Sequence, residues 1–368
     1  MLKRMKELTV DLGARSYPIY IGEGVLGQIG ELFAKHAIGK GSPLLIVTDS
    51  HVAEHHLGAV EARLKEAGYA TVSYTAAWGE KSKSLAVLED IVGAALQAGL
   101  DRKSTVIALG GGVVGDLAGF VAASYMRGIR FVQIPTTILA HDSSVGGKVA
   151  VNHPLAKNII GAFHQPEMVL YDTATLKTLP DREVRAGLSE MIKHGLIWDA
   201  GFTAWLEQNA QKLISLDQEA LQYGLYEGCK VKAAVVSKDE KENDLRAILN
   251  LGHTIGHALE AVAGYGELLH GEAISIGMVG AAKLAMRLGY SGQIYTATKR
   301  ILQTFGLPVR LPAHLETEAI MSAMMHDKKF MEGRMTFIIP TEIGKVEINK
   351  NVSAAWVREV VEELKQEA

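Results

Sequence analysis

The first half of the chain alternates short apolar runs with amphipathic segments. Apolar runs of strand length occupy residues 43–48, 70–74, 105–109 and 131–135, and apolar residues at helical spacing follow the first two at 52–67 and 85–96. Strands and helices that alternate at this spacing form βαβ units and a parallel sheet. Residues 7–12 and 17–21 alternate in polarity and predict an opening pair of strands.

The pattern changes to helices near residue 175, where we place a domain boundary. Helical spacing of apolar residues recurs over 186–198, 202–208, 218–237, 253–262, 272–288, 293–305 and 316–325. A late strand pair, 335–339 and 345–348, and an amphipathic helix, 352–366, complete the chain. We therefore predict a parallel-sheet α/β domain over residues 1–175 and a mostly α-helical domain over 176–368.

Composition narrows the class of protein. The 368 residues are 48% hydrophobic and 21% charged, a typical mix for globular proteins, and the formal net charge of −3 argues against a nucleic-acid binder. The single cysteine, Cys229, excludes an internal disulfide framework and fits a reducing compartment. The longest apolar run, 106–126, contains Asp116 and five glycines, so we interpret it as strand, turn and helix rather than a membrane span. With no visible signal peptide, we expect a cytoplasmic protein.

A histidine-rich stretch offers candidate metal ligands. His253 and His257 are four residues apart, so on a helix their imidazoles lie on one face, and His270 follows after a short turn. Two imidazoles can share a divalent ion, but the site needs a third ligand. Glu190, among apolar residues of an earlier helix, is a natural candidate. The alternative is that the histidines are hydrogen-bonded residues of a helix seam and that Glu190 faces solvent.

Two glycine-rich stretches can bind phosphate. Gly110–Gly115 matches G-x-G-x-x-G between a predicted strand and a predicted helix over 116–126. The acidic residue expected about twenty positions later is missing, and Asp116 places a negative charge at the helix start. Asp49 can take the ribose-binding role or simply cap a helix. Farther on, Lys148, Lys157 and Asn158 form a plausible oxyanion cradle, unless the lysines are ordinary surface residues.

Ten motifs occur in one order along nearly the whole chain. They are Gly79-Glu-x-x-Lys-Ser, Gly110-Gly-Gly-Val-Val-Gly-Asp-Leu-Ala-Gly-Phe, Tyr125-Met-Arg-Gly, Pro135-Thr-Thr, Asp142-Ser-Ser-Val-Gly-Gly-Lys, Lys157-Asn-x-Ile-Gly-Ala-Phe, Glu190-Met-Ile-Lys-His-Gly, Arg246-x-x-Leu-Asn-Leu-Gly-His-Thr-x-Gly-His, His270-Gly-Glu and Asp327-Lys-Lys. In these motifs the chain resembles the 3-dehydroquinate synthases, sugar-phosphate cyclases of the shikimate pathway, which leads to chorismate and the aromatic amino acids. Two departures stand out: the segment before Asp142 is one residue short, and Asn243-Asp244 replaces a glycine.

The resemblance implies a Rossmann-like NAD-binding N-terminal domain and a helical metal-binding C-terminal domain. Carried over by position, the ligands of Zn²⁺ or Co²⁺ would be Glu190, His253 and His270. NAD would contact Asp49, Glu80, Lys83, Gly111, Gly112, Asp116, Thr136, Thr137, Lys148 and Lys157. The substrate, 3-deoxy-D-arabino-heptulosonate 7-phosphate, would contact Arg127, Asp142, Lys148, Asn158, Lys193, Lys232, Arg246, Asn250, His257 and Lys328.

The resemblance also implies the reaction. NAD would oxidise the substrate transiently, phosphate would be eliminated, and reduction and an intramolecular aldol closure would give 3-dehydroquinate. Arg246 and Lys232 would bind the substrate carboxylate. Rival interpretations are a net dehydrogenase of the glycerol or iron-dependent alcohol type and a cyclase of the 2-deoxy-scyllo-inosose or valiolone type, whose substrates lack that carboxylate. We expect a homodimer that binds neither nucleic acid nor membranes.

Overall fold

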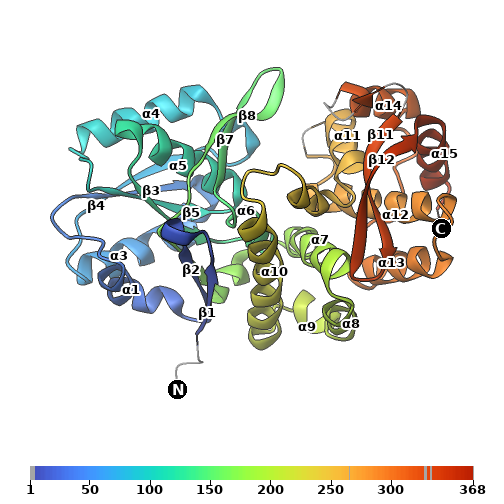
Figure 1. Ribbon diagram of the computed structural model, residues 1–368. Coiled ribbons are helices and arrows are strands. Elements are labelled where there is room, and N and C mark those ends of the chain that lie inside the picture. Colours follow the sequence, from blue (N-terminus) through green and yellow to red (C-terminus); the bar gives the residue numbers. More distant parts are fainter. Residues whose placement is uncertain (1–4, 265, 327–329, 332–333, 368) are drawn as a thin grey trace. The chain divides into compact units, whose positions relative to one another are not determined.

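The computed structural model describes residues 5–264, 266–326, 330–331 and 334–367 (Figure 1). The chain forms two compact units, Met1–Leu179 with Leu221–Lys241 and Pro180–Ala220 with Glu242–Ala368. Helix α10 (Gln218–Lys238) thus lies mainly in the first unit, although the division at residue 175 had assigned it to the second. Its Gln222 amide donates a hydrogen bond to the backbone oxygen of Ile21, 2.9 Å away, a contact that sequence periodicity cannot reveal.

The first unit is built on a seven-stranded sheet of order β1-β2-β9-β6-β5-β3-β4. Its strands are β1 (Lys6–Val10), β2 (Tyr17–Gly22), β3 (Leu44–Asp49), β4 (Thr71–Ala76), β5 (Thr105–Gly110), β6 (Arg130–Pro135) and β9 (Met168–Asp172). β1 pairs antiparallel with β2, and the remaining neighbours are parallel. The predicted parallel sheet is confirmed, while β9 was not among the predicted strands.

Side chains alternate between the two faces of the sheet, and each face has its own core. In β3, Leu45 and Val47 pack on the face covered by α4 (Leu85–Gln97) and α5 (Gly112–Ser124). Ile46 faces the other core, which also contains residues of α1 (Ile29–Lys35) and α3 (Gly58–Glu66). Because both faces are covered, the strands appear in the sequence as continuous apolar runs.

Two helix starts differ from expectation. The helix predicted over 52–67 is interrupted: α2 (Ser50–Val52) runs into a π-helical turn before α3 begins at Gly58. The helix predicted from Asp116 begins four residues earlier, at Gly112, within the glycine motif. Asp116 therefore lies in the second turn, and our expectation that it places its charge at the helix start was wrong.

The stretch interpreted as an oxyanion cradle is a β-hairpin. Strands β7 (Lys148–His153) and β8 (Ala156–Phe163) pair antiparallel, with an irregularity in register near Asn152. A Cβ atom added at Gly161 would lie 2.2 Å from the backbone oxygen of Val149, so the close pairing of the two strands requires glycine there.

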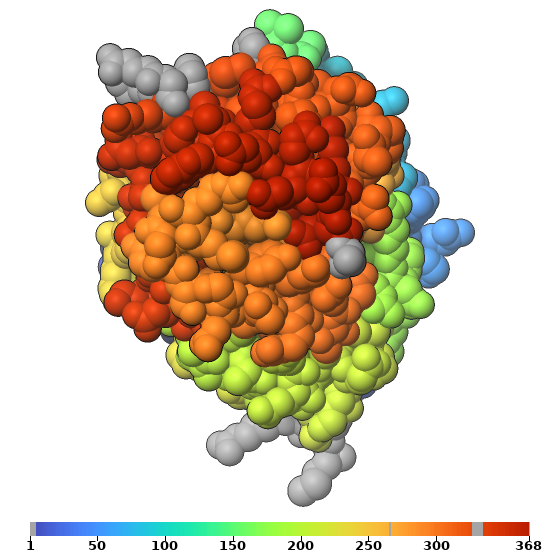
Figure 2. Space-filling view, turned by 90° about the vertical axis from the view of Figure 1, so that its right-hand side faces the viewer, coloured from blue at the N-terminus to red at the C-terminus, as the bar shows by residue number. Residues whose placement is uncertain are grey.

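The second unit is mostly helical, as expected. Its helices are α7 (Asp181–Trp198), α8 (Ala200–Gln208), α9 (Ala210–Ile214), α11 (His253–Ala263), α12 (His270–Arg287), α13 (Gly292–Thr304), α14 (Thr317–His326) and α15 (Ala354–Lys365). A small sheet of β10 (Phe330–Met331), β11 (Arg334–Glu342) and β12 (Lys345–Ser353) includes the predicted late strand pair. Figure 2 shows an outer face of this unit, where the dark-red C-terminal segment lies across the orange surface of earlier helices.

Helix α12 is the centre of the second unit and packs against α7, α11, α13 and α15. Glycines permit the closest approaches. A Cβ atom at Gly271 would lie 1.9 Å from the backbone oxygen of Ala186 in α7, and one at Gly277 would lie 1.9 Å from the backbone oxygen of Gly252. The helices that carry the candidate metal ligands therefore contact one another through their backbones. Among the described residues, no helix is long and apolar enough to cross a membrane.

Glu367 ties the end of the chain to this helical core. Its carboxylate lies 2.6 Å from the Lys283 ammonium and 2.7 Å from the Lys299 ammonium, and it accepts a hydrogen bond of 2.8 Å from the Tyr295 hydroxyl. Burial alone would raise the pKa of Glu367, but hydrogen bonds from these three side chains lower it to about 2.

Candidate functional site

Three predicted metal ligands converge in the second unit. Glu190 comes from the middle of α7, His253 begins α11 and His270 begins α12. Glu190 Oε1 lies 3.6 Å from His253 Nε2 and 3.5 Å from His270 Nε2. Three ligands on tetrahedral bonds of about 2.1 Å would be about 3.4 Å apart, so this spacing fits a zinc-sized ion. Glu190 is buried, which excludes the solvent-facing alternative.

Hydrogen bonds orient both imidazoles. His253 Nδ1 lies 3.1 Å from the backbone oxygen of Leu251, and His270 Nδ1 lies 3.0 Å from Glu260 Oε2. Because a carbonyl and a carboxylate can only accept, we assign the proton to Nδ1 in each ring. The Nε2 atom of each ring then faces Glu190, and a metal that replaced any proton there would be held in the arrangement of metal-ligating histidines. One carboxylate and two imidazoles are a donor set that suits zinc or cobalt.

The electrostatics of the cluster favour a cation. Burial lowers the pKa of His253 well below its usual 6.5, and the Lys193 ammonium lowers it further, so this ring is neutral and able to bind metal. Burial acts in the same direction on His270, but hydrogen bonds with Glu190 and Glu260 outweigh it and raise the pKa to about 10. Two carboxylates around one ring thus create a site at which positive charge is stabilised.

His257 lies beside this cluster on the exposed side of α11. Its ring centroid is 5.1 Å from that of His253 and 5.9 Å from that of His270. Ligand atoms of His257, Glu260 and His270 also lie within 4.8 Å of one another. Two of the candidate ligand sets among the described residues therefore share His270, and of these two the set with Glu190 is the more buried.

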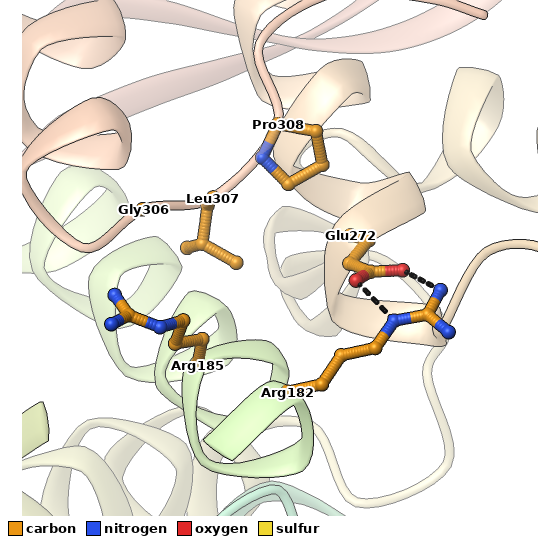
Figure 3. Close-up of a pocket in the computed structure, with 6 residues that line it drawn as sticks. All are labelled: Arg182, Arg185, Glu272, Gly306, Leu307 and Pro308. Atoms are coloured by element: carbon orange, nitrogen blue, oxygen red, sulfur yellow. Dashed lines mark hydrogen bonds and ion pairs between the residues drawn. The ribbon is translucent and has the colours of Figure 1, made fainter.

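A pocket of the second unit lies beside the first turn of α12 (Figure 3). Its cavity of about 250 Å³ is lined by Arg182, Arg185, Glu272, Gly306, Leu307 and Pro308. Arg182 Nε and Nη2 each donate to Glu272 at 2.7 Å, and Glu272 also accepts from the backbone nitrogen of Leu269 at 2.8 Å. This two-pronged ion pair joins α7 to the first turn of α12, next to His270, so we interpret it as a brace for the metal cluster.

In the first unit, the glycine motif forms the turn between β5 and α5. A Cβ atom at Gly111 would lie 2.9 Å from Thr137 Cγ2, so the backbone here is closely packed. The backbone nitrogen of Thr136 donates to the oxygen of Gly110 at 3.1 Å, which places Thr136 beside the turn. Its buried hydroxyl has no hydrogen-bond partner among the described residues. A helix N-terminus with an unsatisfied hydroxyl beside it fits the phosphates of NAD.

Several predicted cofactor and substrate residues form one network around Lys83. The buried Lys83 ammonium donates to Asp116 Oδ2 at 2.7 Å and to the side-chain oxygen of Asn158, and it lies 3.7 Å from Glu80. Burial raises the pKa of Asp116, and the Lys83 charge only partly offsets this effect. Asn152, which sequence reasoning missed, connects the ends of the network because it donates to Glu80 at 2.7 Å and accepts from the backbone of Asn158 at 2.8 Å.

Other predicted residues lie apart or pair with each other. The Lys232 ammonium, on α10, donates to Asp142 Oδ2 at 2.8 Å. Asp49 caps α2, because it accepts hydrogen bonds from the backbone nitrogens of His51 and Val52 at 2.9 and 3.0 Å. This is the second of the two roles, ribose binding or helix capping, that the sequence left open for Asp49. The cap uses one carboxylate oxygen, so the contacts are compatible with a ribose role as well.

The remaining predicted residues differ in exposure and backbone conformation. Lys148 and Lys157 are exposed on the β7–β8 hairpin, and Arg127 is exposed with a left-handed φ of 69°. Arg246 is buried, and Asn250 donates to Glu242 at 3.1 Å in the same unit. Lys328 lies outside the described residues.

Glu260 and Arg182 are further residues that sequence reasoning missed. Glu260 follows His253 by seven residues, a spacing that returns to the same face of a helix. That signal was available in the sequence. The brace joins Arg182 to Glu272, ninety residues apart in the sequence; Arg182 lies in none of the motifs, and Glu272 ends the His270-Gly-Glu motif without a role assigned to it.

Comparisons with known proteins agree with this geometry. Residues 73–186 match the family model for the 3-dehydroquinate synthase N-terminal part, and residues 187–330 match that for the C-terminal part. The 3-dehydroquinate synthase of Desulforamulus reducens is 50% identical over 97% of this chain and 99% of its own.

Solved structures of other proteins also resemble the fold of this chain. A 2-deoxy-scyllo-inosose synthase complexed with carbaglucose-6-phosphate, NAD⁺ and Co²⁺ superposes with a TM-score of 0.89 at 27% identity, covering 98% of this chain and 99% of that one. The 2-epi-5-epi-valiolone synthase of Streptomyces hygroscopicus, with NAD⁺ and Zn²⁺ bound, gives 0.87 at 25% identity, covering 100% and 99%. Because sequence identity of this extent reaches across both units and all of the candidate site, the chain belongs to the 3-dehydroquinate synthase family.

Proposed function

We propose that this protein converts 3-deoxy-D-arabino-heptulosonate 7-phosphate to 3-dehydroquinate and phosphate, with NAD and a divalent zinc or cobalt ion as cofactors. The observation that carries the proposal is the cluster of Glu190, His253 and His270, with ligand spacing near 3.5 Å and both histidines oriented through Nδ1. When bound, NAD would take a hydride from one substrate carbon and later return it, and the metal would polarise the oxygen attached to that carbon.

The first unit supplies the cofactor site. The Gly111–Gly112 turn and the Thr136 and Thr137 hydroxyls would bind the NAD phosphates, and Asp49 would contact the ribose. The network of Glu80, Lys83 and Asp116 would order the edge of the site, and Lys148 and Lys157 would also contact the cofactor. Support comes from the close packing of the glycine turn and from the unsatisfied, buried Thr136 hydroxyl.

We propose substrate contacts for residues of each unit. Lys148, Asn158, Lys193 and Arg127 would hold the phosphate, since three cations and an amide match a dianion. Arg246, Lys232, Asn250 and Lys328 would recognise the carboxylate, and Asp142 and His257 would contact hydroxyls. Arg246 is buried, and a guanidinium can bind both oxygens of a carboxylate at once. A carboxylate-binding role would distinguish this chain from cyclases whose substrates lack a carboxylate.

We extend the proposal to the state of the protein in the cell. We propose that it works as a cytoplasmic homodimer without nucleic-acid or membrane partners. The single, buried Cys229 and the net charge of −3 support this setting. Gel filtration with light scattering tests the dimer, which predicts a mass of twice 39.7 kDa.

An activity assay tests the reaction. Zinc-loaded protein is incubated with the heptulosonate phosphate, and phosphate release is followed with and without NAD⁺ in an amount equal to the enzyme. We expect many turnovers per NAD⁺ and no accumulation of NADH. NADH rising in step with product would support a net dehydrogenase instead, and turnover of glucose 6-phosphate in place of the heptulosonate would support a cyclase of the inosose type.

A further inference from the structure

A carboxylate on α11 contacts the ring nitrogen of His270 that faces away from Glu190. Glu260 Oε2 lies 3.0 Å from His270 Nδ1, and the side chains are 17% and 31% exposed, respectively. Glu260 follows His253 by seven residues, so one face of α11 carries both a candidate ligand and the carboxylate that contacts the next ligand. The two ends of α11 thus act on the same cluster.

The two histidines of the cluster are oriented by different kinds of acceptor. His253 Nδ1 faces the neutral backbone oxygen of Leu251 at 3.1 Å, whereas His270 Nδ1 faces the Glu260 carboxylate. A hydrogen bond to a carboxylate is about twice as strong as one to a neutral acceptor. It also makes the opposite ring nitrogen a better electron donor, and that nitrogen, Nε2, lies 3.5 Å from Glu190 Oε1.

We propose that Glu260 is a positioning residue that holds His270 in its Nδ1–H tautomer, with Nε2 directed at the metal, and so sets the affinity of the site. The inference rests on the proposed metal site. It assigns Glu260 a role distinct from that of a ligand, even though its carboxylate also lies within 4.8 Å of ligand atoms of His257 and His270. In the set with Glu190, Nδ1 of His253 and Nδ1 of His270 each face an acceptor, Leu251 and Glu260 respectively.

The experiment measures cobalt binding, because Co²⁺ reports its coordination through its visible absorption. Full-length protein is stripped with a chelator and titrated with Co²⁺ in competition with a second chelator, and the unfolding midpoint of each apo variant is recorded. Glu260→Ala is expected to weaken Co²⁺ binding about 10- to 100-fold and to change the cobalt spectrum, while one ion still binds. Glu260→Gln, which keeps an accepting oxygen without the charge, should fall between Glu260→Ala and wild type.

Glu267→Gln is the matched control. Glu267 lies between α11 and α12, and its carboxylate contacts His314, 2.7 Å away, so cobalt affinity and spectrum should equal those of wild type. A purely structural role of Glu260 would lower the apo unfolding midpoint and leave cobalt affinity and spectrum unchanged, which would overturn the inference. If Glu260→Ala does not fold, wild-type affinity in Glu260→Gln would overturn it equally.

Two more variants separate this inference from the metal site itself. Loss of all cobalt binding in Glu260→Ala, with binding kept in Glu190→Gln, would make Glu260 a ligand and overturn the positioning role. If the His253→Ala variant still binds one cobalt ion per chain, the proposed metal site is wrong and the inference fails with it. If His253→Ala loses cobalt binding and Glu260→Ala only weakens it, the result supports both the metal site and the positioning role of Glu260.

Discussion

Replacement of Gly271 by alanine tests whether the close contact of α7 and α12 shapes the metal cluster. The new methyl carbon would lie 1.9 Å from the backbone oxygen of Ala186, whereas such contacts are essentially never closer than 3.0 Å. The two helices must therefore separate by about 1 Å. Overpacking of this kind costs about 1–3 kcal/mol of folding stability.

The same shift acts directly on the ligands. His270 precedes Gly271, and Glu190 lies one turn after Ala186, so the 3.5 Å between Glu190 Oε1 and His270 Nε2 would widen towards about 4.5 Å. Two ligands on bonds of about 2.1 Å can be at most about 4.2 Å apart, and that only on opposite sides of the ion. We expect Gly271→Ala to weaken Co²⁺ binding at least about tenfold, or roughly 1.4 kcal/mol.

Urea unfolding of the apo protein and chelator competition for Co²⁺ measure the two effects. Gly93→Ala is the control, because no described atom lies within 4 Å of the added methyl carbon. Gly93 lies within α4, where alanine should stabilise the protein by about 0.5–1 kcal/mol without changing cobalt affinity. Wild-type stability and cobalt affinity in Gly271→Ala would refute the claim that this backbone contact positions the ligands.

Two further predictions concern charge. Because Glu367 has a folded-state pKa of about 2, below its unfolded value of about 4.5, its stabilisation is present above pH 4.5 and is lost as the pH falls through 2. Glu367→Gln should lower the free energy of urea unfolding at pH 7 by on the order of 2–3 kcal/mol, and the difference from wild type should vanish near pH 2. Lys83→Met leaves Asp116 without its cation, so we expect about 3 kcal/mol of destabilisation and weaker NAD⁺ binding by fluorescence titration. Lys83→Met/Asp116→Asn should recover stability but not NAD⁺ affinity; recovery of both would contradict a cofactor role for this pair.

Much of the fold was predictable because burial leaves a local signal. Strands covered on both faces appear as apolar runs, and a serine before an apolar helical pattern is a typical cap: Ser84 accepts from the backbone nitrogen of Val87 at 3.3 Å at the start of α4. The β7–β8 hairpin was missed because β8 is mostly exposed and contains glycine, so neither a continuous nor an alternating apolar pattern identifies it. The position of α10 depends on long-range contacts such as Gln222 with Ile21, for which periodicity has no signal.

Of the candidate site, too, one part was predictable from the sequence and another part was not. Residue type and motif order predicted Glu190, His253 and His270 as metal ligands, because metal chemistry restricts which side chains can serve. The residues that hold them were not identified, since Glu260 and Arg182 act through geometry that only the packed helices create. Pairings such as Lys232 with Asp142 were hidden for the same reason: ninety residues separate partners whose charges meet in the fold.

Anomalous diffraction at the zinc edge, on crystals of the zinc-loaded protein, tests the central claim most directly. The account predicts one strong peak about 2.0–2.2 Å from Glu190 Oε1 and from Nε2 of both His253 and His270. Glu260 would then lie outside bonding distance, on the Nδ1 side of His270. A peak bonded to His257 and Glu260 would contradict the assignment of the metal ligands and the mechanism that depends on them.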